Sequence, residues 1–258
     1  MRDEVYKRRD DFQNCWYKDC CDTNLCGDCN GPCRRFVQTD YLFQLSNLPQ
    51  AQWRVNPMDE SYLTDETLEI LNTIKADIKY FVQSGRSLYL YGLPGTGKTS
   101  WAIRLMSSYF AEVAETTAFT TRGLYVSVPS FLCQAKLNIA YKLNSFRELL
   151  KEIETCDVVV WDEIEQTNPT NYESQLLYAY INGRLLAGKS NIFTSNKNPD
   201  ELKVSDPAMA SRICSASDCI EITGPDMRYK QKYTYFMMNR EETENGSDTS
   251  NKQDSENI

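Results

Sequence analysis

The sequence has 258 residues, enough for one core domain with smaller appendages. Its formal net charge is −8, and −5 of this lies from Glu241 onward, so the body of the chain has no broad basic excess that would indicate nucleic-acid binding. No apolar run approaches the roughly 18 residues that span a bilayer, and the first residues lack the apolar core of a signal peptide. We therefore expect a soluble, cytoplasmic protein with no membrane partner.

Six of the ten cysteines lie within 19 residues near the start of the chain: Cys15, Cys20, Cys21, Cys26, Cys29 and Cys33. In a reducing compartment, thiolates at this density favour a structural Zn²⁺ site over a set of disulfides. Because the chain contains no histidine, such a site would use cysteine alone. We expect four ligands from Cys15, Cys21, Cys26, Cys29 and Cys33, with Cys20 an alternative to Cys21. Reactive or merely tolerated thiols and an iron–sulfur cluster remain open, and the four later cysteines are expected to be small core residues.

The pattern along the chain predicts four parts. Residues 1–36 would form the cysteine-rich module, which is too small to hold a core without metal. Residues 37–60 would be a connector that packs through aromatic side chains: Tyr41, Phe43 and Trp53. Residues 61–228 would be the core domain. Residues 229–258 would be an extension, largely disordered from about residue 241 because it is rich in Glu, Asn, Ser and Asp.

The core begins with an amphipathic helix. Thr64 opens it, apolar residues recur every three or four positions, and Gly85 ends it. The apolar run Ser87 to Tyr91 then predicts a buried strand.

Residues 92–100 read Gly-Leu-Pro-Gly-Thr-Gly-Lys-Thr-Ser, the complete pattern G-x-x-x-x-G-K-[ST] of a phosphate-binding loop. Its glycines leave backbone N–H groups free to surround phosphates, Lys98 supplies a positive charge, and Thr99 offers a hydroxyl to Mg²⁺. A strand before the loop and a helix after it are the context that distinguishes such a site from a simple glycine-rich turn. We predict that the loop binds a nucleoside triphosphate through Gly92, Leu93, Pro94, Gly95, Thr96, Gly97, Lys98, Thr99 and Ser100.

The rest of the core alternates strands and helices. The expected elements are a strand at 123–128, a helix from 129 with helical composition at 131–150, a strand at 157–161, a helix at 172–186, and strands at 191–194 and 219–223. This alternation predicts an α/β fold of the P-loop NTPase type, with helices on both faces of a parallel sheet.

A pair of carboxylates follows the apolar strand Asp157 to Trp161. Asp162 and Glu163 come directly after it, where a Walker B pair belongs. Asp162 would hold Mg²⁺ together with Thr99, and Glu163 would polarise the water that attacks the γ-phosphate. A solvated acidic turn is the alternative.

Three further polar residues suit the same chemistry. Asn196, at the end of a strand, would reach the γ-phosphate or the attacking water. Arg212 and Arg228 carry permanently charged guanidinium groups, which suit stabilisation of a transferring phosphoryl group. Spacing alone does not decide whether either arginine acts in its own site or in a neighbour's, and a surface ion pair is the alternative role.

The order of these motifs over residues 60–228 resembles the AAA+ ATPases of the DnaC/DnaI/IstB group, which includes replicative helicase loaders and a transposition helper ATPase. The segments 125–129 and 181–188 fit the same pattern. The resemblance implies that Asn196 is sensor 1, Arg212 an arginine finger acting on the next subunit's ATP, and Arg228 a sensor 2 arginine. It also implies ATP and Mg²⁺ as ligands, a homo-oligomer with ATP sites between subunits, a replicative helicase as partner, and contacts with single-stranded DNA.

Two features depart from the group's pattern. Glu163 stands where these loaders commonly have a second Asp, a change that should preserve catalysis because Glu is the usual AAA+ base. The cysteine-rich module resembles the zinc-binding amino-terminal domains of loaders from Gram-positive bacteria and their phages. The two do not align well enough to assign zinc ligands residue by residue. The layout is most similar to a phage-encoded member, which would act in the host cytoplasm.

The leading expectation is therefore an ATPase that delivers a helicase to single-stranded DNA, with the zinc module docking the helicase. The first alternative is an IstB-like transposition ATPase, in which a cysteine cluster would not be expected. The second is an adaptor that binds ATP without hydrolysis, which would need neither Glu163 nor Arg212. A metabolic P-loop kinase would need an arginine-rich lid, and residues 197–207 offer none.

Overall fold

The structure is a computed structural model that describes residues 34–52, 60–116, 120–165 and 170–228. The predicted cysteine ligands, Trp53 and the predicted extension from residue 229 lie outside these ranges. None of the helices in the described ranges is both long enough and apolar enough to cross a membrane.

Five strands form one parallel sheet in the order β2-β3-β4-β1-β5. Their bounds are β1 Ser87–Tyr91, β2 Gly123–Ser127, β3 Val158–Asp162, β4 Ser190–Ser195 and β5 Ser217–Glu221. The predicted parallel sheet is therefore confirmed. Because β4 lies between β1 and β3, the segments that follow these three strands meet at one edge of the sheet.

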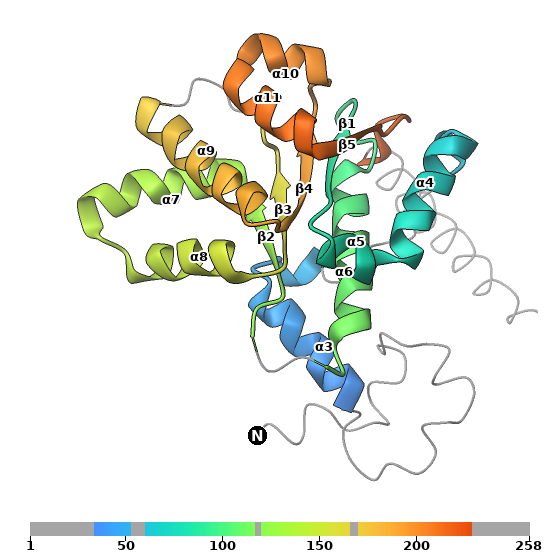
Figure 1. Ribbon diagram of the computed structural model, residues 1–258, viewed down its shortest axis with the longest axis horizontal. Coiled ribbons are helices and arrows are strands. Elements are labelled where there is room, and N and C mark those ends of the chain that lie inside the picture. Colours follow the sequence, from blue (N-terminus) through green and yellow to red (C-terminus); the bar gives the residue numbers. More distant parts are fainter. Residues whose placement is uncertain (1–33, 53–59, 117–119, 166–169, 229–258) are drawn as a thin grey trace, which may run out of the picture.

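Helices cover both faces of the sheet, as the alternating pattern predicts (Figure 1). Along β1, Leu88 and Leu90 belong to one apolar core, whereas Tyr89 belongs to the other. The first core contains α4 Asp65–Ala76, α5 Ile78–Gln83 and α6 Lys98–Val113; the second contains α7 Val128–Tyr141, α8 Asn144–Thr155, α9 Asn171–Leu186 and α11 Pro207–Ala216. Strands β1 to β4 are thus buried on both faces, which explains the apolar runs of β1 and β3, whereas the edge strand β5 is largely exposed.

Two predicted helices are each broken in two. The first ends at Ala76 and restarts at Ile78 because Asp77 leaves the helical region, with φ −117° and ψ 37°. The second breaks at Lys142, which has a left-handed φ of 48°. In both places the apolar spacing continues across the break, so the pattern alone does not reveal it.

Two short helices before β5 were not predicted as helices. They are α10 Pro199–Ser205 and α11. Asn198 and Asp206 cap them with their side-chain oxygens, and a proline follows each cap. These cap and proline positions are sequence signals that would have located both helices.

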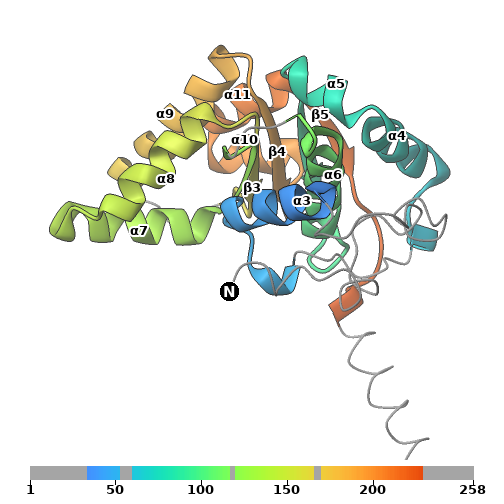
Figure 2. The same ribbon diagram turned by 90° about the horizontal axis from the view of Figure 1, so that it is seen from below.

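Helix α3, Arg34–Leu45, crosses the predicted boundary between the module and the connector. It packs beside α6 at the β2 edge of the sheet (Figures 1 and 2), with Leu42 and Phe43 buried. The Phe43 ring meets the Phe110 ring edge-on, with centroids 5.1 Å apart. The connector therefore contributes directly to the core, through Phe43 as the sequence predicts.

Candidate nucleotide-binding site

The predicted phosphate-binding loop leaves β1 and enters α6 at Lys98. Gly92, Gly95 and Gly97 have φ of 144°, 79° and 100°, values that side chains with a Cβ rarely adopt. The loop consequently curls over the start of α6, where unpaired backbone N–H groups and the helix dipole favour bound anions.

The segment after β5 packs against this loop. A Cβ on Gly92 would lie 2.4 Å from the Ile222 carbonyl oxygen, and a Cβ on Gly95 would lie 2.0 Å from Oδ1 of Asp226. The Met227 N–H also donates to the Gly95 carbonyl oxygen, at 3.0 Å. The sequence did not single out Asp226, because its contact with the loop depends on how residues far apart in the chain fold together.

Lys98 is buried at the centre of the site. Its Nζ donates to the carbonyl oxygens of Gly92 and Leu93, at 2.9 and 2.7 Å, and to Oδ1 of Asn196, at 2.8 Å. Burial lowers the pKa of Lys98, and the positive charge of Arg228 acts in the same direction. The end of β4 thus brings Asn196 to the P-loop lysine.

The Asp162 carboxylate accepts three hydroxyl hydrogen bonds. Thr99 and Thr194 donate to Oδ1, at 2.8 and 2.6 Å, and Tyr125 donates to Oδ2, at 2.6 Å. A threonine hydroxyl beside a carboxylate is an oxygen donor set that suits Mg²⁺. The sequence pairs Thr99 with Asp162 but does not identify the roles of Tyr125 and Thr194, which come from neighbouring strands.

Glu163 follows Asp162 in a left-handed conformation, with φ 59°. Its N–H donates to Oγ1 of Thr194, at 3.1 Å, and its side chain is exposed. The Asn196 N–H donates to Oε1 of Glu165, at 2.8 Å. These contacts place Glu163 and Asn196 beside the loop that contains Lys98 and Thr99.

The two predicted arginines lie in different surroundings. Arg228 is exposed, its Nε is 3.9 Å from Oδ1 of Asp226, and its charge acts on Lys98, so it lies near the P-loop. Arg212, on α11, instead donates from Nε to Oδ1 of Asn182 in α9. The chain thus gathers the predicted site residues around Lys98, while Arg212 is held by a helix flanking the sheet.

The predicted zinc site lies outside the described residues. Within the described ranges, no group of three or more His, Cys, Asp or Glu side chains is placed to hold a metal ion. Of the four later cysteines, Cys156 is buried, Cys214 is partly buried, and Cys133 and Cys219 are exposed. The expectation that all four are core residues is therefore wrong for the two exposed thiols, which lie on the outer sides of α7 and β5.

The family model of IstB-like ATP binding proteins matches residues 29–234. The chain belongs to this family. The predicted P-loop, Walker B pair and three polar residues all lie inside the matched range, and the predicted kinship with the DnaC/DnaI/IstB group is confirmed.

Two curated relatives of this IstB-like protein have names that refer to DNA replication. It is 28% identical over 131 residues to the chromosomal replication initiator protein DnaA of Mycoplasma pneumoniae, covering 50% of this chain and 28% of that protein. It is 28% identical over 120 residues to the replicative helicase loader DnaI of Bacillus subtilis, covering 46% of this chain and 36% of that protein. The chain therefore spans well under half the length of either relative.

Solved structures show the same fold. The DnaC helicase loader matches with a TM-score of 0.53 and 17% identity, over 68% of this chain and 100% of that chain. AMPPCP-bound DnaA from Aquifex aeolicus matches with a TM-score of 0.50 and 19% identity, over 70% of this chain and 56% of that chain. This IstB-like chain thus shares its fold with these two proteins.

Proposed function

We propose that the protein is a Mg²⁺-dependent ATPase that acts in DNA replication by delivering a helicase to single-stranded DNA under the control of ATP. The observation that carries the ATPase assignment is the convergence on Lys98 and Thr99 of a carboxylate, Asp162, and an amide, Asn196, from two neighbouring strands. A loop that merely bound nucleotide would not need a potential base, Glu163, beside that carboxylate.

Each residue has a definite task in this proposal. Lys98 leaves its carbonyl partners for the β- and γ-phosphates, and Thr99 and Asp162 hold Mg²⁺. Held there, Mg²⁺ would supply positive charge that offsets the negative charge of the phosphates. Glu163 takes the proton of the attacking water. Asn196, whose N–H donates to the Glu165 carboxylate, orients that water or the γ-phosphate.

The test is steady-state ATP hydrolysis by the purified protein, with and without single-stranded DNA, beside Glu163→Gln. We expect turnover that DNA stimulates and that Glu163→Gln lowers by about 10²- to 10⁴-fold, because the amide cannot accept the proton. The variant should still bind a fluorescent ATP analogue. Binding without turnover in the wild type, with DNA and a replicative helicase present, would instead favour the adaptor.

The helicase-loader assignment is separate from the ATPase assignment. It is supported by the sequence match to DnaI and by the cysteine cluster at 15–33, which an IstB-like transposition ATPase would not be expected to carry. A purified replicative helicase should raise turnover and bind the protein in an ATP-dependent manner. A response to a transposase and not to the helicase would favour the transposition role. Zn²⁺ bound by four of the clustered cysteines is part of the loader proposal, and elemental analysis of the full chain tests it.

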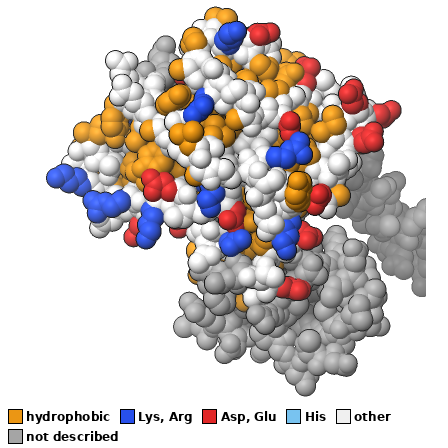
Figure 3. Space-filling model, in the orientation of Figure 1, with side chains coloured by type: hydrophobic (Ala, Val, Ile, Leu, Met, Phe, Trp, Pro, Cys, Tyr) orange, Lys and Arg blue, Asp and Glu red, His pale blue; other side chains and the backbone are white. Residues whose placement is uncertain are grey.

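The ATP sites are proposed to lie between subunits of a homo-oligomer. Large exposed apolar side chains gather on α7 and α9: Leu137, Ile139, Tyr141, Tyr172, Tyr178 and Leu186. Figure 3, in the orientation of Figure 1, shows hydrophobic side chains on the left of the molecule, where α7 and α9 lie. Arg212 is tied to α9 through Asn182, so it lies beside one of these two helices, and we propose that the next subunit's nucleotide site packs there.

A further inference from the structure

Both oxygens of the Asp162 carboxylate are held by hydroxyl groups from the strands on either side of β3. Tyr125 on β2 donates to Oδ2 and Thr194 on β4 donates to Oδ1, each at 2.6 Å. β2 and β4 are the two neighbours of β3, so the carboxylate is held from both sides. Its rotation about the last side-chain bond would break at least one of these bonds.

Tyr125 is itself firmly fixed. The residue is 7% exposed, so water does not compete for the bond from its hydroxyl to the Asp162 carboxylate. Its N–H donates to the Ser46 carbonyl oxygen, at 2.7 Å, and its carbonyl oxygen accepts from Nδ2 of Asn47, at 3.3 Å. The turn after α3 thus hydrogen-bonds to the outer edge of β2 and holds Tyr125 in place.

Thr194 connects Asp162 to Glu163. Its hydroxyl donates to the Asp162 carboxylate and accepts from the Glu163 N–H, at 3.1 Å. One hydroxyl therefore orients both members of the Walker B pair. The side chain is 1% exposed, so water does not compete for these bonds.

We propose that Tyr125 and Thr194 are positioning residues for Mg²⁺, which hold the Asp162 carboxylate in the orientation that receives the ion beside Thr99. The inference rests on the proposed Mg²⁺-dependent function. Groups that hydrogen-bond a ligating carboxylate fix its direction, and losing one lowers metal affinity by about 10- to 100-fold. A purely structural role would instead weaken folding and leave the dependence on Mg²⁺ unchanged.

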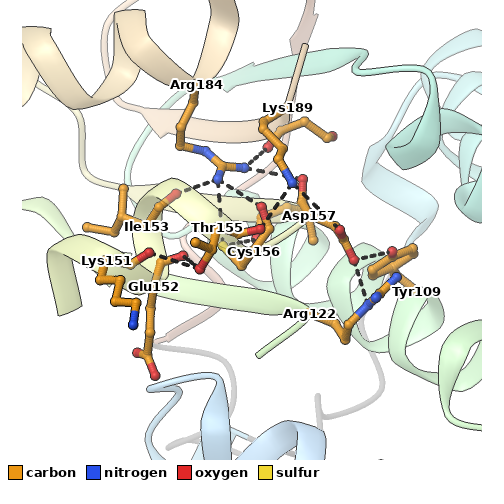
Figure 4. A network of polar contacts seen from close by, with 12 residues as sticks. Tyr109, Arg122, Lys151, Glu152, Ile153, Thr155, Cys156, Asp157, Arg184 and Lys189 are labelled. Atoms are coloured by element: carbon orange, nitrogen blue, oxygen red, sulfur yellow. Dashed lines mark hydrogen bonds and ion pairs between the residues drawn. The ribbon is translucent and has the colours of Figure 1, made fainter. Parts of the chain in front are cut away.

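The test compares Tyr125→Phe with Tyr109→Phe. Tyr109 is also buried, and its hydroxyl donates to Oδ2 of Asp157, at 2.8 Å. Figure 4 shows the bond between Tyr109 and Asp157. Asp157 directly precedes β3, whereas Asp162 ends it, so the control removes the same kind of bond at the opposite end of one strand. Binding of a fluorescent, non-hydrolysable ATP analogue is measured in EDTA and along a Mg²⁺ titration, with thermal unfolding measured without nucleotide.

We expect Tyr125→Phe to raise the half-saturating Mg²⁺ concentration about 10-fold or more, while analogue affinity in EDTA stays within about twofold of wild type. Tyr109→Phe should lower thermal stability and leave the Mg²⁺ titration unchanged. Thr194→Val should shift the titration like Tyr125→Phe, and Thr194→Ser, which keeps the hydroxyl, should restore it.

The outcomes separate this inference from the proposed function. Wild-type Mg²⁺ dependence that persists in both Tyr125→Phe and Thr194→Val would overturn the inference and leave the Mg²⁺ site intact. Wild-type binding that is indifferent to Mg²⁺ would overturn the proposed Mg²⁺ site itself. If Tyr125→Phe does not fold, the inference is tested by comparing Thr194→Val with Thr194→Ser. Equal half-saturating Mg²⁺ concentrations for these two variants would overturn it.

Discussion

Glu163 has a left-handed backbone, with φ 59°, which is uncommon for a residue with a Cβ. Its N–H bond to Thr194 and the following bond from the Ile164 N–H to the Thr194 carbonyl oxygen, at 3.0 Å, hold it there. Strained residues of this kind persist where surrounding contacts over-determine them, and they cluster at functional sites. The conformation turns the chain sharply after β3, and this turn keeps the proposed base next to Asp162.

Gly95 supplies the first prediction. Gly95→Ala adds a Cβ at φ 79° that would lie 2.0 Å from Oδ1 of Asp226, so the loop and the segment after β5 must separate. We expect loss of stability of about 1–3 kcal/mol and at least a tenfold loss of ATP-analogue affinity. Gly183→Ala is the control, because a Cβ there meets nothing within 4 Å, and alanine in mid-helix should stabilise by about 0.5–1 kcal/mol. Wild-type analogue binding by Gly95→Ala would contradict the argument.

At the scale of elements, one buried arginine ties helices and strands together at the end of the sheet opposite the nucleotide site. Arg184 of α9 donates to the carbonyl oxygens of Ile153, Cys156, Asp157 and Ser190 and to the side chain of Asn191. These groups end α8 and begin β3 and β4 (Figure 4). Burial lowers the pKa of Arg184, but a guanidinium remains charged at neutral pH.

Replacing Arg184 by Ala should destabilise the fold by about 3 kcal/mol or more, because several buried carbonyl oxygens lose their donor. The protein that remains folded should bind the ATP analogue normally, since the P-loop lies at the other end of the strands. Chemical denaturation measures the first effect and analogue titration the second. Arg86→Ala is the control: its ion pair with Asp218 is half exposed and should contribute less than about 1 kcal/mol. Similar losses for both variants would refute the assigned role.

At the scale of the whole molecule, the proposed catalytic groups divide into two sets. Lys98, Asp162 and Asn196 converge within one chain, whereas Arg212 is fastened to α9. A helical flank with exposed apolar side chains suits contact with another copy of the chain. This division is what the proposed assembly requires, with each site completed by an arginine from the next subunit.

Mixing variants tests that assembly. Arg212→Ala should keep analogue binding and lose turnover by about 10³-fold or more, because no guanidinium stabilises the transferring phosphoryl group. Glu163→Gln should also lose turnover, by about 10²- to 10⁴-fold. Mixing the two should restore turnover, because some sites would then combine an intact Glu163 with an intact Arg212. Full activity of Arg212→Ala alone would rule out a finger at this residue, and two inactive variants that stay inactive when mixed would place its action within one chain.

Local sequence patterns are enough to predict the candidate nucleotide-binding residues and the class of fold. A P-loop is a local pattern of glycines, lysine and threonine, and an acidic pair after a buried strand is equally local, so both can be recognised without tertiary contacts. The alternation of strands and helices likewise predicts a parallel sheet. The sequence pattern does not reveal the helix breaks at Asp77 and Lys142, where the apolar spacing continues although the backbone turns.

The residues that surround those local motifs are set by contacts between segments far apart in the chain. Tyr125 and Thr194 reach Asp162 from 37 and 32 residues away, because strand order brings β2 and β4 to either side of β3. Asp226 meets Gly95 because β5 pairs with β1, and Arg184 joins α8 to β3 and β4 because α9 packs against α8 and β4. Hydrogen bonds between distant segments depend on strand pairing and helix packing, which no short sequence pattern encodes.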